Sequence, residues 1–491
     1  MTSLSADSLL MRLQLSKRMQ WFLAIIIIVL AALSQYLFGI EYFVAAGIAV
    51  AVGTFCFRNE FLLLASYIMA LVVVGLHERT EAMALGPIEL FAAFIMVYAL
   101  LYVGYKKIFY KRDFAFHSSL FLIFGYVLWA LLSSIISIAT NDNTINYSFR
   151  EFLSFSPLIV LPVLCREVRK TVASFDKYMF CLMLLGWIII LLVSVLHIRS
   201  TVVQATYLYE TGFARYDVMN SSVLLLLFLG LVMLEATWKK RMPFIIGICI
   251  AAVGVLITFA RTSWVGIVFC IPILIFFSPR VERKRGIRAM LLISSVSLIS
   301  FVIMYFSSPL IKAIVQFSFL HFTSSSKVGT DPSLVNRYIE WGYVFKQIFE
   351  TPITGVGFGG RFTLYNWLGG VVYRTGYTHN GLMVLLLKGG IVGLLLVMTA
   401  FISFFRLGIQ LAVSKVLSDR ERMIARVGVI SLVFMMFHMM TLGLFIHREI
   451  MWYLGLIWGY FIALYEQVKS QERIDTLPSE TNASPTVNAR S

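Results

Sequence analysis

Long apolar stretches, separated by short polar segments, run through most of the 491-residue chain. A bilayer-spanning helix takes about 20 apolar residues, so this pattern predicts roughly fourteen spans. Three of the stretches are short, and the one at 152–164 carries Pro157 and Pro162, which favours a kinked or re-entrant segment and a count as low as twelve. The predicted spans are 21–38, 40–57, 61–76, 85–105, 119–139, 152–164, 178–197, 219–238, 243–259, 262–278, 289–306, 381–405, 427–446 and 450–466.

The composition places the chain in a membrane. Hydrophobic residues make up 59% of it and charged residues 13%, and the mean hydropathy is +0.86. No soluble domain has this balance, so the predicted fold class is an all-α polytopic membrane protein. The net charge of +16 is scattered between the apolar stretches, which favours a role in setting topology over binding to nucleic acid. The five cysteines form no CxxC pair, so we expect neither a disulfide framework nor a zinc site.

Clusters of lysine and arginine occupy every second loop, whereas the loops between them carry isolated arginines. Because these residues collect on the cytoplasmic side, both termini are predicted inside, with an even number of spans. The alternation places the long segment 307–378 outside the cytoplasm. The predicted parts are a cytoplasmic segment 1–20, transmembrane helices over 21–306, an extracytoplasmic loop 307–378, transmembrane helices over 379–466, and a disordered cytoplasmic tail 467–491.

The extracytoplasmic loop contains a predicted amphipathic helix. Asp331 and Pro332 suit its start, as N-cap and first helical residue, and the Thr351-Pro352 pair ends it. Arg337 lies at the edge of the apolar stripe, where an arginine beside a membrane needs an anionic partner. The apolar stripe consists of Leu334, Tyr338, Trp341, Phe345 and Ile348. The predicted polar side of the helix consists of Asn336, Glu340 and Gln347.

A glycine-rich turn, Gly355-Val-Gly-Phe-Gly-Gly360, follows this helix. It matches the GxGxxG pattern formally, but no strand precedes it and no βαβ unit surrounds it, so we expect no dinucleotide site. Its glycines, Gly357 among them, allow the backbone to approach another element or a substrate. Farther along, Lys388 lies within an apolar run and is expected to pair with an acidic group or to line a cavity.

Four groups on the predicted outer side can carry chemistry: Arg215, Arg261, Arg337 and His379. Each has an ordinary explanation, because an arginine at a span end can reach the headgroups, Arg337 can pair with Glu340, and an interfacial histidine is commonly structural. Arg261 fits such explanations least, since no Asp or Glu lies within twenty residues on either side of it. Together, three guanidinium groups suit a diphosphate and an imidazole suits a proton acceptor.

This set predicts transfer of a group from a lipid diphosphate to a hydroxyl. Trp341 and Asn380, beside the charged groups, are further candidates for contact with the substrate. No acidic pair of the DxD type appears on the predicted outer side, so the sequence calls for no metal and no cofactor.

The chain resembles the bacterial O-antigen ligase and O-antigen polymerase family of membrane glycosyltransferases over about residues 205–465. The first matching segment is NRYIEWGYVFKQIFETPITGVGFGG, followed by THNGLMVLLLKGGIVGLLL, and the others are FARTSWVGIVF and GFARYDVMNSSVLLLL. The His-Asn element with its upstream glycine turn is the more specific motif, whereas each arginine alone is a weak one.

The resemblance implies a GT-C-like helical fold with an extracytoplasmic catalytic cavity and an undecaprenyl-diphosphate-linked glycan as donor. It implies that Arg261 and Arg337 hold the diphosphate, with Arg215 as a third contributor. It also implies that His379 accepts the proton of the acceptor hydroxyl or organises that hydroxyl, and that catalysis is independent of metal.

The chain has more predicted spans than is typical of the family's ligases, which favours a polysaccharide polymerase in the bacterial cell membrane. Its substrate would be lipid-linked oligosaccharide, and a chain-length regulator would be a partner. A ligase that transfers the glycan to lipid A core or another acceptor is the alternative. A transporter or flippase of lipid-linked sugars is a third hypothesis, which the lack of detectable inverted repeats disfavours.

Overall fold

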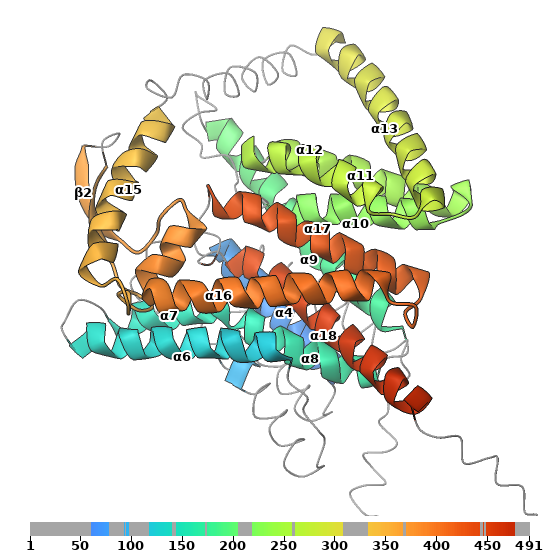
Figure 1. Cartoon of the computed structure of the whole chain (residues 1–491). Helices are drawn as coiled ribbons and strands as arrows, with labels where there is room; N and C mark the ends of the chain where they lie inside the picture. Colours follow the sequence, from blue (N-terminus) through green and yellow to red (C-terminus); the bar gives the residue numbers. More distant parts are fainter. Residues whose placement is uncertain are drawn as a thin grey trace, which may run out of the picture.

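The computed structural model of the chain is mainly helical (Figure 1), and it describes residues 60–77, 93, 95–97, 117–139, 144–171, 174–204, 219–257, 261–307, 332–366, 370–441, 445 and 448–476. The helices of these ranges are α4 (Glu60–His77), α6 (Ser118–Ala139), α7 (Ile145–Phe155), α8 (Pro157–Thr171), α9 (Phe175–Gln204), α10 (Asn220–Leu234), α11 (Trp238–Ile257), α12 (Arg261–Phe276), α13 (Arg280–Ser307), α15 (Pro332–Glu350), α16 (Gly381–Val413), α17 (Asp419–Met439) and α18 (Arg448–Thr476).

Several of these helices can cross a membrane. Within the described ranges, α6, α9 over Phe175–Leu192, α16 and α17 are long and apolar enough to do so. A fifth candidate consists of α7 and α8, which meet at a bend of 41°. The bend falls between Phe155 and Pro157, so the prediction of a broken or re-entrant segment at 152–164 is confirmed. The chain is a mostly helical, multi-pass membrane protein.

The total of twelve to fourteen spans stays a prediction. The predicted spans 21–38 and 40–57, and most of 85–105, lie outside the described residues. α10 and the stretch Thr262–Phe276 of α12 are apolar but shorter than a full span. Both helices begin within one residue of the starts that the apolar stretches at 219–238 and 262–278 predicted.

Polar residues at helix ends extend two helices beyond the apolar stretches that predicted them. α17 begins at Asp419, well before the predicted 427–446, because Ser418 and Glu421 form a capping box there. α18 continues to Thr476, so the part of the tail from 467 to 476, predicted to be disordered, is helical. An ion pair between Lys469 and Glu472, one turn apart, supports this extension.

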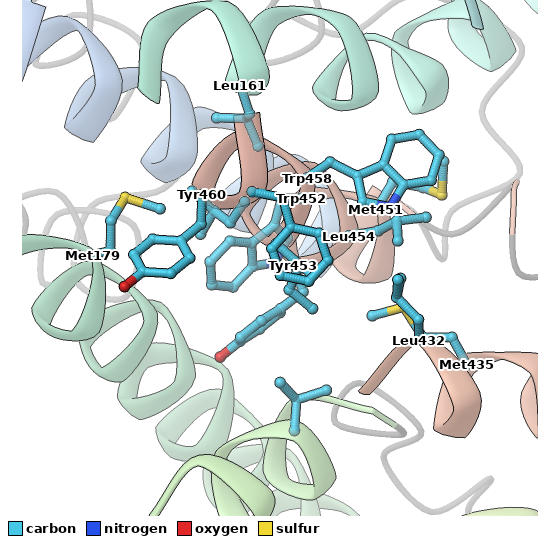
Figure 2. Close-up of a cluster of buried hydrophobic side chains, with 14 of the residues drawn as sticks. Leu161, Met179, Leu432, Met435, Met451, Trp452, Tyr453, Leu454, Trp458 and Tyr460 are labelled. Atoms are coloured by element: carbon cyan, nitrogen blue, oxygen red, sulfur yellow. The ribbon is translucent and has the colours of Figure 1, made fainter. Parts of the chain in front are cut away.

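The core of the bundle is built around α18, which packs most extensively against α8. The two helices approach closely at Gly455 and Gly459, because a Cβ at Gly455 would collide with the backbone of Pro157 and a Cβ at Gly459 with the side chain of Cys165. Figure 2 shows Trp452 and Trp458 of α18 surrounded by side chains from α8, α9 and α17. The ring of Trp458 also stacks on Phe404 of α16, with 4.0 Å between ring centroids. α18 thus packs against α8, α4, α16 and α7, whereas α10 and α17 join the helices α11, α12 and α13 to the bundle.

A hairpin of two strands, β1 (Phe362–Asn366) and β2 (Val371–Thr375), interrupts the all-helical fold that the sequence predicted. The strands pair antiparallel, with Phe362 opposite Thr375 and Leu364 opposite Tyr373. Apolar residues alternate with polar ones in β1, so Phe362 and Leu364 share one buried face. This face forms a second, smaller core that joins the hairpin to α15 and α16, and it contains Val344, Ile348, Phe362, Leu364, Met383 and Leu387.

Ion pairs join the helix ends at the end of the bundle away from the hairpin. They link α8, α9, α13, α17 and α18, so the basic segments 166–177, 280–288 and 415–426 lie together at this end. The basic loop predicted at 106–112 lies outside the described residues. The assignment of this end to the cytoplasm stays a prediction. The pairs with carboxylate–guanidinium distances of 2.6–2.7 Å are Arg169–Glu421, Arg420–Asp176 and Arg426–Glu282, and Arg166–Glu466 is a further pair.

Candidate functional site

His379, which directly precedes the N-cap of α16, is held by Glu340 of α15. The carboxylate oxygen Oε1 accepts a hydrogen bond from the backbone N of His379 at 2.6 Å, and Oε2 lies 2.7 Å from the ring nitrogen Nδ1. The side chain of Glu340 is 2% exposed and that of His379 is 26% exposed. The glutamate is thus anchored inside the protein, while the imidazole reaches the surface.

The ionisation of Glu340 determines which nitrogen of His379 carries a proton. Burial raises the pKa of Glu340, but the hydrogen bonds and the charge contributed by His379 outweigh this and hold the pKa below its ordinary value. A carboxylate only accepts hydrogen bonds, so Nδ1 must donate, and a neutral imidazole then has its lone pair on Nε2. The edge-to-face contact with Tyr377, at 4.8 Å between centroids, further restrains the ring.

The assignment of Glu340 to the polar side of the amphipathic helix was wrong. Glu340 shares a buried face with Val344 and Ile348, at positions i, i+4 and i+8. Conversely, Tyr338 and Phe345 of the predicted apolar stripe are 55% and 41% exposed. The apolar surface of α15 is wider than one stripe, and the protein covers only one flank of it. The spacing of Glu340, Val344 and Ile348 allows this face, but the sequence pattern alone does not select it.

The three arginines of the predicted site are described to different extents. Arg337 is half-buried on α15, one turn before Glu340. Arg261 is the first residue of α12. Arg215 lies outside the described residues. Convergence of the three guanidinium groups therefore stays a prediction.

A series of contacts brings the helix ends that carry Arg261, His379 and Arg337 to one end of the bundle (Figure 1). Ser263, two residues after Arg261, contacts His438 of α17, with 3.0 Å between Oγ and Nε2. The backbone O of Met440, just beyond α17, accepts a hydrogen bond from Asn380 Nδ2 at 3.5 Å. The neighbouring His379 then binds Glu340 of α15. α12, α17, α16 and α15 are thus linked in sequence at this end.

Asn380 and Trp341, the other predicted contact residues, have distinct roles in this region. Asn380 caps α16, since its side chain accepts hydrogen bonds from the backbone N of Leu382 and Met383. Trp341 Nε1 is buried without a hydrogen-bond partner in the described structure, and the same holds for Asn336 Oδ1 and Thr441 Oγ1. Buried polar atoms are normally paired, so these atoms are suited to hydrogen bonds with a polar ligand.

The glycine turn is inserted into a break in α16. Gly390 has a φ of 59° and interrupts the helix. The helical bond between Leu387 O and Ile391 N is replaced by bonds to the turn: Val356 N donates to Leu387 O at 2.8 Å, and Ile391 N donates to Pro352 O at 2.9 Å. The prediction that this turn allows the backbone to approach another element is confirmed.

Gly357, a predicted substrate contact, lies against α6. A Cβ at Gly357 would collide with the backbone of Ser133 and Ser134, and its φ of 75° also favours glycine. Its backbone N donates to Lys388 O at 3.0 Å. Packing between α6 and α16 therefore explains why residue 357 is a glycine. Contact between Gly357 and a substrate stays a prediction.

Lys388 pairs with an acidic group, which was one of the two roles predicted for it. Its Nζ donates to Glu151 Oε1 of α7 at 2.8 Å and to Gly360 O at 2.6 Å, and its side chain is 1% exposed. The second carboxylate oxygen of Glu151 accepts a hydrogen bond from Gly359 N at 2.6 Å. The sequence did not identify Glu151, because nothing in the chain connects a glutamate on α7 with a lysine 237 residues later.

Comparison with known proteins adds a family to this geometry. The family model described as O-antigen ligase matches residues 245–398. This range contains Arg261, Arg337, Glu340, His379 and Lys388, whereas Arg215 and Glu151 lie before it. No curated protein matches the chain. Among the described residues, no group of three or more His, Cys, Asp or Glu side chains is arranged to hold a metal ion. Over residues 245–398 the chain is thus similar to the O-antigen ligase family, which is the family that its sequence resembles.

Proposed function

We propose that the protein is a polysaccharide polymerase that transfers a glycan from an undecaprenyl-diphosphate-linked donor to a sugar hydroxyl of another lipid-linked repeat unit. The observation that carries the proposal is the His379–Glu340 pair inside the family match. A histidine oriented through Nδ1 by a buried carboxylate is arranged to accept a proton at Nε2.

In the proposed reaction the acceptor hydroxyl oxygen attacks the anomeric carbon of the donor sugar. A new glycosidic C–O bond forms, the bond between that carbon and the diphosphate oxygen breaks, and the hydroxyl proton moves to Nε2 of His379. The lipid diphosphate leaves with the bonding electron pair, and the guanidinium groups of Arg261 and Arg337, with Arg215, stabilise its charge. The chemistry needs no metal, so we expect activity to persist in EDTA.

A ligase is the second candidate, because the matching family is described as O-antigen ligase. Its chemistry would be the same, with lipid A core or another molecule as acceptor. The larger number of predicted spans favours the polymerase.

Purified protein incubated with lipid-linked repeat units alone tests the proposal. A polymerase makes longer lipid-linked chains, whereas a ligase makes product only when its separate acceptor is added. Movement of the lipid across vesicles without formation of any glycosidic bond would contradict both and favour a transporter. The His379→Ala variant is the control, and we expect it to form no product.

A further inference from the structure

α15 has an aromatic face that stays exposed in the part of the chain that the structure describes. Tyr338, Phe345 and Phe349 lie at positions i, i+7 and i+11, and they are 55%, 41% and 78% exposed. Gly342, which lies between Tyr338 and Phe345 on this face, has only open space around its Cβ position. The face is therefore apolar and continuous over three turns.

This aromatic face separates the other two sides of the helix. Glu340 and Val344 point into the protein, and Lys346 and Glu350 are on the exposed polar side. A helix with one protein-facing side, one aromatic side and one charged side suits the boundary between a bilayer and water. Figure 1 shows α15 running across the end of the bundle rather than along it, which is the orientation such a boundary requires.

A hydrogen bond fixes the depth of the C-terminal end of α15. Ser133 Oγ of α6 donates to Thr354 O at 2.9 Å. Ser133 lies six residues before the end of α6, so at 1.5 Å per residue it is about 9 Å inside that end of the span. The chain just after α15 is therefore held beside the apolar part of a membrane-spanning helix.

The aromatic face is also continuous with a face of α6 that is exposed in the same way. Phe121, Leu128, Leu132 and Ile135 form an exposed stripe along α6, as expected for a side that contacts lipid chains. Ile353 is 60% exposed and directly precedes Thr354. Thr354 accepts the hydrogen bond from Ser133, which follows Leu132 of the stripe, so the exposed residues Phe349 and Ile353 lead along the chain to this point of α6.

We propose that Tyr338, Phe345, Phe349 and Ile353 are seated in the interfacial layer of the lipid bilayer, so that lipid covers this side of α15. Glu340 lies on another side of the same helix, and the bilayer would therefore set the depth of His379. If the proposed function holds, the histidine acts at the level of the lipid headgroups, where a lipid diphosphate is located.

Spin labels on α15 test the proposal without any assay of activity. The full chain, with its own cysteines replaced by alanine, carries a nitroxide at F349C and is reconstituted into vesicles of phosphatidylethanolamine and phosphatidylglycerol. The K346C label, nearly one turn away on the polar side, is the matched control. Power saturation then measures collisions of each label with oxygen, which concentrates in lipid, and with a water-soluble nickel chelate.

We expect the label at 349 to collide with oxygen and to be protected from the nickel chelate, and the label at 346 to show the reverse. Equal exposure of both labels to the nickel chelate would place the helix in water and overturn the proposal. Protection of the label at 349 from both reagents would mean that protein covers the face, from this chain or a second copy, and would overturn it as well.

Discussion

At the scale of single residues, Glu340 uses both carboxylate oxygens on one neighbour, one for the backbone of His379 and one for its ring. The first bond fixes the position of the histidine at the start of α16, and the second fixes the rotation of its imidazole. Because the folded pKa of Glu340 is lowered, its contribution to stability is complete above the ordinary carboxyl pKa and is lost as the pH falls through the lowered value. The contact therefore persists at neutral pH.

The pair predicts a defined effect of Glu340→Gln. The amide keeps the size of the side chain but removes the charge that stabilises the protonated ring, so we expect kcat to fall by about 100- to 10,000-fold. Chain extension on lipid-linked repeats measures this loss. Glu340→Asp keeps the charge and is the matched variant, so it should retain more activity than Glu340→Gln. An equal loss of kcat in both variants would mean that Glu340 has only a structural role.

The proposed role of the arginines predicts that substitution by lysine, which keeps the positive charge, still lowers activity. A guanidinium binds a diphosphate through a planar fork, whereas an ammonium is a point charge, so we expect Arg261→Lys or Arg337→Lys to lose most of the activity. Product length on a gel measures the loss. Arg285→Lys, at the opposite end of the bundle, is the control and should leave the ladder unchanged. Wild-type ladders from Arg261→Lys and Arg337→Lys would remove both arginines from the mechanism.

The sequence made His379 a candidate, and that role stays a prediction, but it missed the partner of His379 for a physical reason. A histidine beside a predicted span end is visible in one dimension, because only local pattern is needed. Glu340 is distinguished by its burial, and that depends on which flank of α15 the hairpin and α16 cover. The hydrophobic pattern of α15 is compatible with either flank, so tertiary packing decided between them.

At the scale of elements, the insertion of the glycine turn into α16 depends on one buried ion pair. Lys388 and Glu151 together bind the turn at Gly360 O and Gly359 N. The break at Gly390 supplies the backbone groups that the turn binds, and irregular backbone beside membrane spans is tolerated when it is buried in protein in this way. The three features form one unit that holds the segment between α15 and β1.

This unit predicts that Lys388→Met strongly destabilises the protein. The change leaves Glu151 with an uncompensated charge and Gly360 O without a donor, and breaking a buried pair from one side costs about 3–5 kcal/mol. We expect a lower apparent Tm in detergent and faster proteolysis between α15 and α16. Lys346→Met, on the exposed side of α15, is the matched control and should change neither measurement.

The double variant Glu151→Gln with Lys388→Met separates charge from packing. The glutamine removes the unpaired charge but can still accept a hydrogen bond from Gly359 N, so the double variant should recover part of the Tm lost by Lys388→Met. A double variant that is less stable than Lys388→Met alone would show that the pair is not coupled as the distances indicate.

The elements themselves were predictable where hydrophobicity defines them. The apolar stretches 61–76, 119–139 and 381–405 predicted α4, α6 and the first part of α16. Of the two prolines that predicted a kink, Pro157 begins α8 at the break, whereas Pro162 lies inside α8. The hairpin was not predicted, because β1 and β2 are short and derive their stability from packing on α15 and α16. The break in α16 was not predicted either, because it lies within an apolar run and the pair Gly389-Gly390 alone does not indicate a break.

At the scale of the whole molecule, charge divides the two ends of the bundle. The end away from the hairpin gathers basic loops whose charges are partly balanced by Asp176, Glu282 and Glu421. The other end carries the hairpin, α15 and the start of α16 (Figure 1), which His379 precedes. Because lysine and arginine collect on the cytoplasmic side of membrane proteins, the first end is predicted to be cytoplasmic and the candidate site to face away from the cytosol.

Single cysteines at the two ends test this orientation. V372C lies on the hairpin at a position that is 67% exposed, and K415C lies in the exposed loop between α16 and α17. In a chain without other cysteines, a membrane-impermeant maleimide added to spheroplasts should label V372C at once and K415C only after permeabilisation. Inside-out vesicles should give the opposite order. This is the result that a lipid-diphosphate donor reacting outside the cytoplasm requires, since the substrate must meet His379 after it has crossed the membrane. Labelling of K415C in intact spheroplasts, with V372C protected, would invert the protein and exclude an extracytoplasmic reaction.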